Sequence, residues 1–271
     1  MNTFVRRAAL GCVLGAAVLM ACGTPEAPRA TAPGSAAPPS RPPTLAPGPG
    51  GLTPVFRRAG RAHGKVVALT FDADMTAGQG ARAAAGERFD NPRLIRTLRR
   101  LEVPATVFMT GRWAEEYPRQ ARAIGRDPLF EVANHSYSHH AFTEDCYGLP
   151  RLPVARMRAD VERAFAAFRR AGVARPMPYF RFPGGCYDRR ALRALGATGV
   201  TAVQWDVVSG DAFATDARAV VAEVLGGVRP GSVVVMHCTR SAAPVTERAL
   251  RTIVPELRER GYRFVKVSEL I

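Results

Sequence analysis

The 271-residue chain has five histidines, and three of them fall within six residues. His135 and His139 stand four positions apart, a spacing that places two side chains on one face of a helical turn. Such a pair can direct two imidazole nitrogens at one metal ion, as in many zinc sites. A lone histidine is more often an ordinary surface or core residue, and we interpret His63 and His140 in that way.

Two carboxylates, Asp72 and Asp74, follow an apolar run. In an extended chain they lie on the same side, where they need a cation or an arginine to offset their repulsion. Such an aspartate pair also occurs in turns and helix caps. The metal site is therefore inferred from the aspartates and the histidines together. One carboxylate and two imidazoles leave a coordination position open for water, which is typical of catalytic zinc. The second carboxylate can then act as a general base.

Other reactive side chains also follow apolar runs of the sequence. These residues are Arg181, Trp205, Asp206, Asp211 and His237. In a parallel barrel the carboxyl ends of all strands lie on one face, where active sites form. We therefore expect these residues to lie near the aspartate and histidine pairs.

The elements that must position these residues alternate between strand and helix. Apolar runs predict strands at residues 65–71, 105–110, 129–133, 179–182, 200–205, 232–236 and 262–267. Helical patterns predict helices at residues 91–100, 112–125, 154–170, 189–195, 215–228 and 245–260. About seven strand-then-helix units predict a parallel sheet with helices outside it, and seven or eight units allow closure into a barrel. The glycine-rich phosphate-binding turns of nucleotide-binding folds are missing from the sequence.

The first 22 residues have the composition of an export signal. Arg6 and Arg7 precede an apolar run that is shorter than the ~20 residues a membrane-spanning helix needs. The run ends in Leu-x-Ala-Cys at Cys22, which resembles the bacterial lipobox. We therefore expect an acylated Cys22 that anchors an exported lipoprotein to the cell membrane, facing the cell wall. An ordinary secretory signal is the alternative.

Residues 23–54 are rich in Pro, Ala, Gly, Ser and Thr. This composition buries too little apolar surface to offset its ordering entropy, so we predict a disordered linker followed by one domain at residues 55–271. The formal charge of +15 favours anionic partners such as wall polymers or phospholipids, and export argues against nucleic acid. We expect a monomer.

Three cysteines fall in the predicted domain: Cys146, Cys186 and Cys238. Each follows a strand-end motif, so we expect them on the face that carries the site. Export permits disulfides, and we expect one between two loops there. Three cysteines form at most one pair, whose partners the sequence does not identify.

From residue 64 to the end, the motifs resemble those of polysaccharide deacetylases, the NodB-type carbohydrate esterases. They occur in the order of that family: Thr-Phe-Asp-Ala-Asp, His-Ser-x-x-His, Arg-x-Pro-Gly, an aspartate motif after a tryptophan, and a final apolar-x-His. Each motif alone is common, but five in this order are specific. The resemblance implies a distorted (β/α)7–8 barrel and one divalent metal ion, usually Zn²⁺.

The resemblance also implies a role for each matching position. The implied metal ligands are Asp74, His135 and His139. Asp72 would be the base that takes a proton from the attacking water, and Arg181 would hold it ionised. His237 would be the general acid that protonates the departing amine, and the Gly184 N–H would polarise the acetyl carbonyl.

This chain departs from the family pattern at several positions. Ala73 separates the two aspartates, which adjoin in the family, so Asp74 is assigned as a ligand from the geometry of an extended strand. The family often has an aromatic residue where Gly184 stands, so we expect a more open pocket wall. Either Asp206 or Asp211 would serve as the carboxylate behind His237. Trp205 would line the sugar site or belong to the core.

The implied activity is removal of N-acetyl groups from the amino sugars of a cell-wall polysaccharide, peptidoglycan or a chitin-like polymer. Hydrolysis of O-acetyl esters would use the same residues and is the first alternative. A catalytically silent wall-binding lipoprotein is the second, supported only by the altered motif around Asp211.

Overall fold

The computed structural model describes residues 41–271. The expected signal peptide with its lipid attachment site Cys22, and residues 23–40 of the expected linker, lie outside the described residues. None of the described helices combines the length and the apolar composition that crossing a membrane requires.

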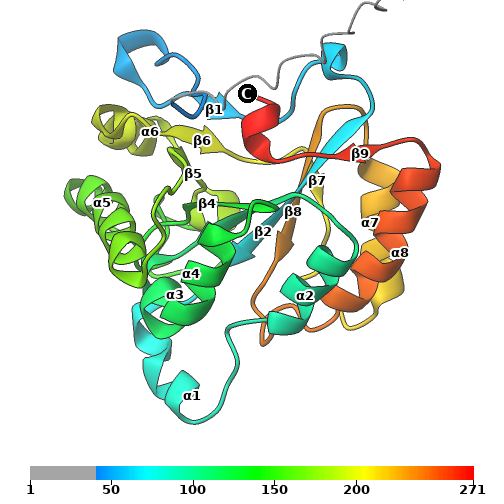
Figure 1. Cartoon of the computed structure of the whole chain (residues 1–271). Helices are drawn as coiled ribbons and strands as arrows, with labels where there is room; N and C mark the ends of the chain where they lie inside the picture. Colours follow the sequence, from blue (N-terminus) through cyan, green and yellow to red (C-terminus); the bar gives the residue numbers. More distant parts are fainter. Residues whose placement is uncertain (1–40) are drawn as a thin grey trace, which may run out of the picture. The chain divides into compact units, whose positions relative to one another are not determined.

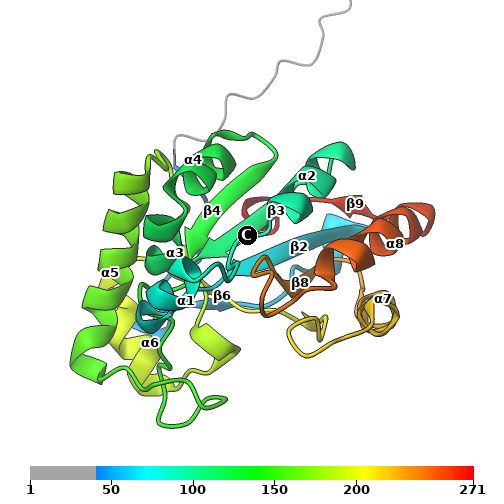
Figure 2. The same cartoon turned by 90° about the horizontal axis from the view of Figure 1, so that it is seen from below.

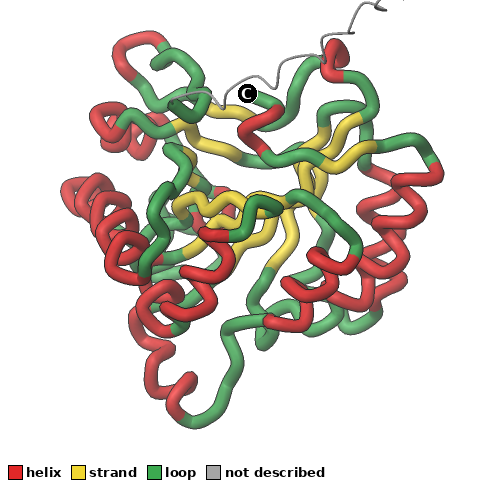
Figure 3. Tube along the Cα trace, in the orientation of Figure 1, coloured by secondary structure: helices red, strands yellow, loops and turns green. Residues whose placement is uncertain are grey.

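Nine strands of the described chain form one curled sheet, and every pairing between them is parallel (Figures 1 and 3). The order is β1-β6-β5-β4-β3-β2-β8-β7, and β9 pairs with β2. Their bounds are β1 Val55–Phe56, β2 Val66–Ala73, β3 Ala105–Met109, β4 Phe130–Asn134, β5 Tyr179–Phe180, β6 Thr201–Val203, β7 Val207–Val208, β8 Ser232–His237 and β9 Arg263–Phe264.

The helices lie outside the sheet. They are α1 Gly80–Ala84, α2 Pro92–Arg100, α3 Gly111–Glu116, α4 Pro118–Arg126, α5 Val154–Ala171, α6 Arg189–Leu195, α7 Ala217–Gly227 and α8 Thr246–Glu259. Figures 1 and 2 show α2, α7 and α8 along one flank of the sheet and α3 to α6 along the other. The prediction of a distorted parallel barrel covered by helices is therefore confirmed.

Local sequence determines where several helices begin and end. The Asn91 side chain caps α2 by accepting from Leu94 N, and the Asp188 side chain caps α6 in the same way. Helix α5 ends at Gly172 in the left-handed conformation. The single helix predicted at residues 112–125 is two helices, because the chain leaves helical geometry at Tyr117, before a proline. The short elements β1, α1 and β7 were not predicted.

Side chains alternate between the two faces of each strand. In β2, Val67, Leu69 and Phe71 belong to the core cluster that packs beneath the helices. Val66 and Ala68 belong to the cluster inside the barrel. Because the period of a strand is two residues, Asp72 continues the inward-facing row to the carboxyl end of β2.

Residues 41–54 lie against the barrel, although they were expected in the disordered linker. The Tyr179 hydroxyl donates to Pro43 O at 2.9 Å, and Leu45 N donates to Thr201 Oγ1 at 3.0 Å. Thr53 N donates to Leu192 O at 3.1 Å. The expected boundary at residue 55 therefore does not mark the start of the packed chain, because main-chain hydrogen bonds hold a segment that has few apolar side chains.

Glu131 anchors the C-terminal segment inside the barrel. Its Oε1 accepts from Thr106 Oγ1 at 2.7 Å and from Ser268 N at 3.2 Å. Thr106 Oγ1 in turn accepts from Val267 N at 3.0 Å. Burial raises the pKa of the Glu131 carboxyl, and these hydrogen bonds oppose the rise without cancelling it.

We predict that Glu131→Gln stabilises the protein at neutral pH. Because its pKa is raised, the Glu131 carboxyl keeps a proton in the folded state that the unfolded chain releases. The protonated carboxyl therefore contributes fully to the free energy of unfolding below the unfolded pKa, and this contribution is lost as pH rises through the folded pKa. Glutamine keeps the Oε1 acceptor without the buried charge. Thermal unfolding at pH 7 should show a higher midpoint for the variant, with the difference shrinking towards pH 4. A lower midpoint at pH 7 would contradict this account.

Candidate active site

Inward-facing residues at the carboxyl ends of four strands meet at one place. Asp72 near the end of β2 stands opposite His237 at the end of β8 in the strand register. His135 directly follows β4, and Arg181 directly follows β5. The parallel sheet thus brings together residues that are up to 165 positions apart in sequence, as between Asp72 and His237.

Asp74, His135 and His139 form a compact set of possible metal ligands. Their ligand atoms lie within 4.8 Å of one another. Asp74 Oδ1 is 3.3 Å from His135 Nε2 and 3.7 Å from His139 Nε2. This oxygen is buried and has no hydrogen-bond partner within residues 41–271. A buried, unpartnered carboxylate oxygen that faces two imidazoles fits a divalent cation.

Burial and close charges shift the pKa of each member of this set. Burial alone would raise the pKa of the Asp74 carboxyl, but the surrounding histidines, His139 foremost, hold it well below its usual range. Burial lowers the pKa of His139 to about 4. Burial also opposes the charged form of His135, yet the adjacent Asp72 and Asp74 carboxylates raise the pKa of His135. These shifts favour the charged Asp74 carboxylate and the neutral His139 imidazole, the forms in which these groups bind a metal ion.

The two histidines converge through an irregular loop, and the expected helical turn between them is wrong. Ser136 and His139 have positive φ angles of 68° and 57°. Ser136 N donates to Asn134 Oδ1, and His139 N donates to Ser136 Oγ. Asp160 on α5 accepts from Tyr137 N at 2.7 Å and from Ser138 N at 3.3 Å. Side chains thus satisfy the backbone N–H groups that helical hydrogen bonds would otherwise use.

Asp72 forms a buried ion pair with Arg181. Arg181 Nη1 donates to Asp72 Oδ1 at 2.7 Å, and the arginine is 0% exposed. Its Nε donates to Val203 O, and its guanidinium stacks on the Phe108 ring at 3.9 Å. Asp72 Oδ2 lies 3.7 Å from His135 Nε2, so this carboxylate borders the set of metal ligands.

Asp211 is the carboxylate behind His237. Its Oδ1 lies 2.7 Å from His237 Nδ1, and its Oδ2 accepts from Thr246 Oγ1 at 2.7 Å. Burial opposes the charged imidazole, but the Asp211 hydrogen bond prevails and raises the pKa of His237 to about 10. His237 Nε2 lies 3.9 Å from Asp74 Oδ2. Asp206, the alternative partner, binds Ser232 Oγ and Val233 N at the other end of β8.

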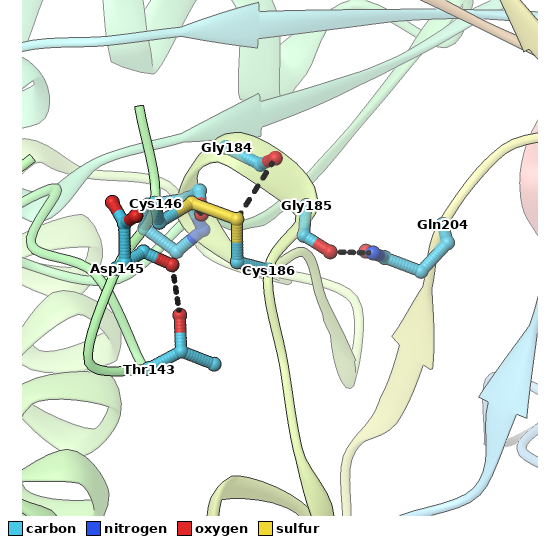
Figure 4. Close-up of a disulfide and its surroundings, with 8 residues drawn as sticks. Thr143, Asp145, Cys146, Gly184, Gly185, Cys186 and Gln204 are labelled. Carbon is cyan, nitrogen blue, oxygen red and sulfur yellow. Dashed lines mark hydrogen bonds between the residues drawn. A yellow bond between two sulfur atoms is a disulfide. The ribbon is translucent and has the colours of Figure 1, made fainter. Parts of the chain in front are cut away.

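Gly184 lies beside a disulfide between Cys146 and Cys186 (Figure 4). The expected open wall at this position is wrong. Gly184 has a φ of +62°, and a Cβ there would lie 2.6 Å from Cys146 Sγ and 3.3 Å from the Tyr147 ring. The disulfide-linked loop therefore occupies the space that a larger side chain would need.

Trp205 is half-buried and packs against the core cluster inside the barrel, the second of the two positions expected for it. Its ring packs against the barrel interior and lies 5.4 Å from the Arg181 guanidinium. A Cβ at Gly185 would lie 2.4 Å from this ring, so the tryptophan touches the loop that carries Gly184.

Sequence reasoning missed the residues that hold the site from the surrounding elements. Asn134, Asp160 and Thr246 each make a hydrogen bond to a site residue or to the histidine loop. Only Asn134 adjoins a motif, and Asp160 occurs within an ordinary helical pattern. Nothing in the sequence distinguishes Asp160 from an aspartate on the surface of a helix.

Residues 59–203 match the family model described as polysaccharide deacetylase. The chain belongs to this polysaccharide deacetylase family. The resemblance inferred from the five motifs is thereby confirmed. Outside the matched span lie Asp211 and His237, whose places in the site rest on the geometry above.

Three relatives illustrate the range of this family. The chain is 28% identical to a chitooligosaccharide deacetylase from Bradyrhizobium, over 67% of this chain and 84% of the relative. It is 26% identical to a peptidoglycan-N-acetylglucosamine deacetylase from Bacillus cereus, over 76% of this chain and 88% of the relative. Its structure is similar to that of a CE4 family pseudoenzyme from Bacillus anthracis, with a TM-score of 0.65, 25% identity and coverage of 83% and 69%.

We predict that Asp160→Ala weakens binding of a divalent metal ion, with Zn²⁺ as the probe, roughly 10-fold or more, the range found when supports of metal ligands are removed. The loop that carries His139 would lose its two hydrogen bonds to α5. Zinc affinity is measured by competition with a chelator. Glu162→Ala is the matched control, because it removes only an exposed ion pair with Arg158 on the same helix. Equal zinc affinity in both variants would contradict the role given to Asp160.

Proposed function

We propose that this protein is a metal-dependent hydrolase that removes N-acetyl groups from the amino sugars of a cell-wall polysaccharide, peptidoglycan or a chitin-like polymer. One observation carries the proposal: the Asp74, His135 and His139 set lies between an arginine-paired carboxylate and a carboxylate-paired imidazole. The deacetylases among its relatives support the choice of an N-acetylated sugar.

We propose Zn²⁺ as the metal, because two imidazoles and one carboxylate are the ligand set of many catalytic zinc sites. Asp74, His135 and His139 would hold it. A divalent cation supplies Lewis-acid polarisation of the acetyl carbonyl and makes a nearby water more acidic.

Asp72 has the position of a general base. Arg181 holds Oδ1 and thereby fixes the orientation of the carboxylate, while Oδ2 faces His135, one of the proposed metal ligands. A water that attacks the acetyl carbon beside the metal ligands can lose its proton to Oδ2.

His237 has the position of a general acid. Asp211 fixes Nδ1, so Nε2 is directed towards Asp74 and the set of metal ligands. Nε2 can then donate a proton to the amine as the bond from nitrogen to the acetyl carbon breaks. The Gly184 N–H and the Trp205 ring are the proposed contacts for the acetyl oxygen and the sugar.

A catalytically silent wall-binding protein is the second candidate, because a structural neighbour is a pseudoenzyme. Against it stand the complete set of proposed ligands and the pairs Asp72–Arg181 and Asp211–His237. A site under no catalytic demand would not be expected to keep two buried carboxylates in these pairings.

We further propose that the protein is an exported, monomeric lipoprotein, attached to the cell membrane through Cys22 and facing the cell wall. The composition of residues 1–22 supports this location. The Cys146–Cys186 disulfide is consistent with an oxidising compartment.

The first prediction from this function separates catalysis from metal binding. Asp72→Asn should lower acetate release from N-acetylglucosamine oligomers and peptidoglycan by ~10²–10⁴-fold, the usual cost of losing a general base. It should retain Zn²⁺, whereas Asp74→Ala should lose it. Acetate release is measured with Zn²⁺ and after chelation. Acetate release that continues after chelation would contradict the metal-dependent mechanism. Acetate release only from O-acetyl esters would show that the protein is an O-acetyl esterase.

The second prediction concerns the carboxylate behind His237. Asp211→Asn should lower kcat by at least ~10²-fold with little change in KM, because the imidazole loses its anionic partner. Asp206→Asn is the matched control, since Asp206 supports the other end of the same strand. A similar fall in kcat for both variants would assign Asp211 a structural role only.

A further inference from the structure

A groove with a volume of about 900 Å³ lies beside the active site, between α2 and α8. Its walls come from the segments that follow β2, β7 and β8, the strands that lead to Asp72, Asp211 and His237. The segments that follow β2 and β8 are joined by a hydrogen bond from Ser241 N to Arg88 O at 3.0 Å. Figure 2 shows α2 and α8 side by side.

The groove carries an excess of positive charge. Six arginines line it, namely Arg88, Arg93, Arg96, Arg240, Arg248 and Arg251, against two carboxylates. Arg88 is paired with Asp90, and Arg251 is paired with Glu247. The other four arginines form no ion pair with a carboxylate in the described part of the chain. Like charges held together in a concave surface attract anions.

The backbone adds to this positive potential. The first residues of α2, at Pro92, and the N-cap of α8, at Val245, both line the groove. The N-terminal end of a helix carries a partial positive charge. Two helix ends and four unpaired guanidinium groups therefore face one space.

Short chain segments and hydrogen bonds connect the groove to the proposed catalytic residues. Arg240 follows His237 by three residues, and the intervening Thr239 accepts a hydrogen bond from Asp74 N at 2.8 Å. Thr246, which binds Asp211, lies between the groove residues Val245 and Glu247. The groove therefore lies next to the segments that carry His237 and Asp211.

We propose that this arginine groove binds an anionic stretch of the polymer on which the enzyme acts, through carboxylate or phosphodiester groups along the chain. Arginine forms forked hydrogen bonds with both kinds of group, so the shared chemistry is a repeated oxyanion. The inference rests on the proposed function for the link to the substrate, but binding to the groove is measurable without turnover.

The test measures binding of the full chain to two labelled probes by fluorescence anisotropy. A polygalacturonate oligomer carries carboxylates, and poly(glycerol phosphate) carries phosphodiesters, so their relative affinities identify the anionic group. Arg240→Gln combined with Arg248→Gln should weaken binding at least ~10-fold for the preferred probe, as loss of two charge-assisted contacts implies. Binding should also weaken as salt is raised.

The matched control removes the same charge at the other end of the barrel. Arg169 and Arg175 are exposed at and beyond the end of α5, near the amino ends of the strands, and Arg169→Gln with Arg175→Gln should leave binding within about two-fold. An equal loss of polyanion affinity in both double variants would show that general surface charge causes the effect, and it would overturn the proposed role of the groove. Binding to phosphatidylglycerol vesicles but to neither soluble polyanion would also overturn it, in favour of a membrane surface.

Turnover separates this inference from the proposed function. Arg240→Gln with Arg248→Gln should raise the KM for an acidic N-acetylated oligosaccharide at least ~10-fold more than the KM for a neutral one of equal length. Polyanion binding without any acetate release would overturn the proposed function alone. Acetate release without polyanion binding would overturn the groove alone.

Discussion

The buried Arg181 guanidinium is the constraint on which the rest of the site depends. A charge with no exposure to water must be paired and hydrogen-bonded, and Asp72, Val203 O and Gln204 O meet that requirement. These partners belong to β2 and to the chain at the end of β6. Arg181 therefore connects β2 with the chain at the end of β6, at the level of Asp72, the proposed base. The stability of this end of the barrel and the orientation of the proposed base depend on the same group.

The surrounding helices add a second layer of support. Asp160 on α5 fixes the loop between the two histidines, and Thr246 at the start of α8 fixes Asp211. The histidine loop needs such support because it includes Ser136 and His139 at positive φ, which costs conformational energy. The site is thus built from rigid strands inside and braced by helices outside, an arrangement suited to holding a cation at fixed distances.

The sequence predicted seven of the nine described strands, their parallel pairing and the meeting of Asp72, Asp74 and His237, because apolar runs and the two-residue period of a strand are local signals. It did not distinguish Asp206 from Asp211, since that choice depends on which end of β8 each loop reaches. It also assigned a helical turn to His135 and His139, whereas side-chain acceptors from Asn134 and Asp160 impose another backbone path. The pairing of Cys146 with Cys186 and the closed wall at Gly184 likewise follow from loop contacts that leave no local pattern.

The packing of residues 41–54 places the beginning of the described chain at the amino ends of the strands. Pro43 is held by Tyr179 and Leu45 by Thr201, residues at the amino ends of β5 and β6. Asp72, His237 and the arginine groove lie at the carboxyl ends of the strands, on the opposite pole. The first described residues therefore lie at the pole of the barrel opposite to the proposed catalytic face. A polymer can therefore approach the face with Asp72 and His237 without contacting residues 41–54.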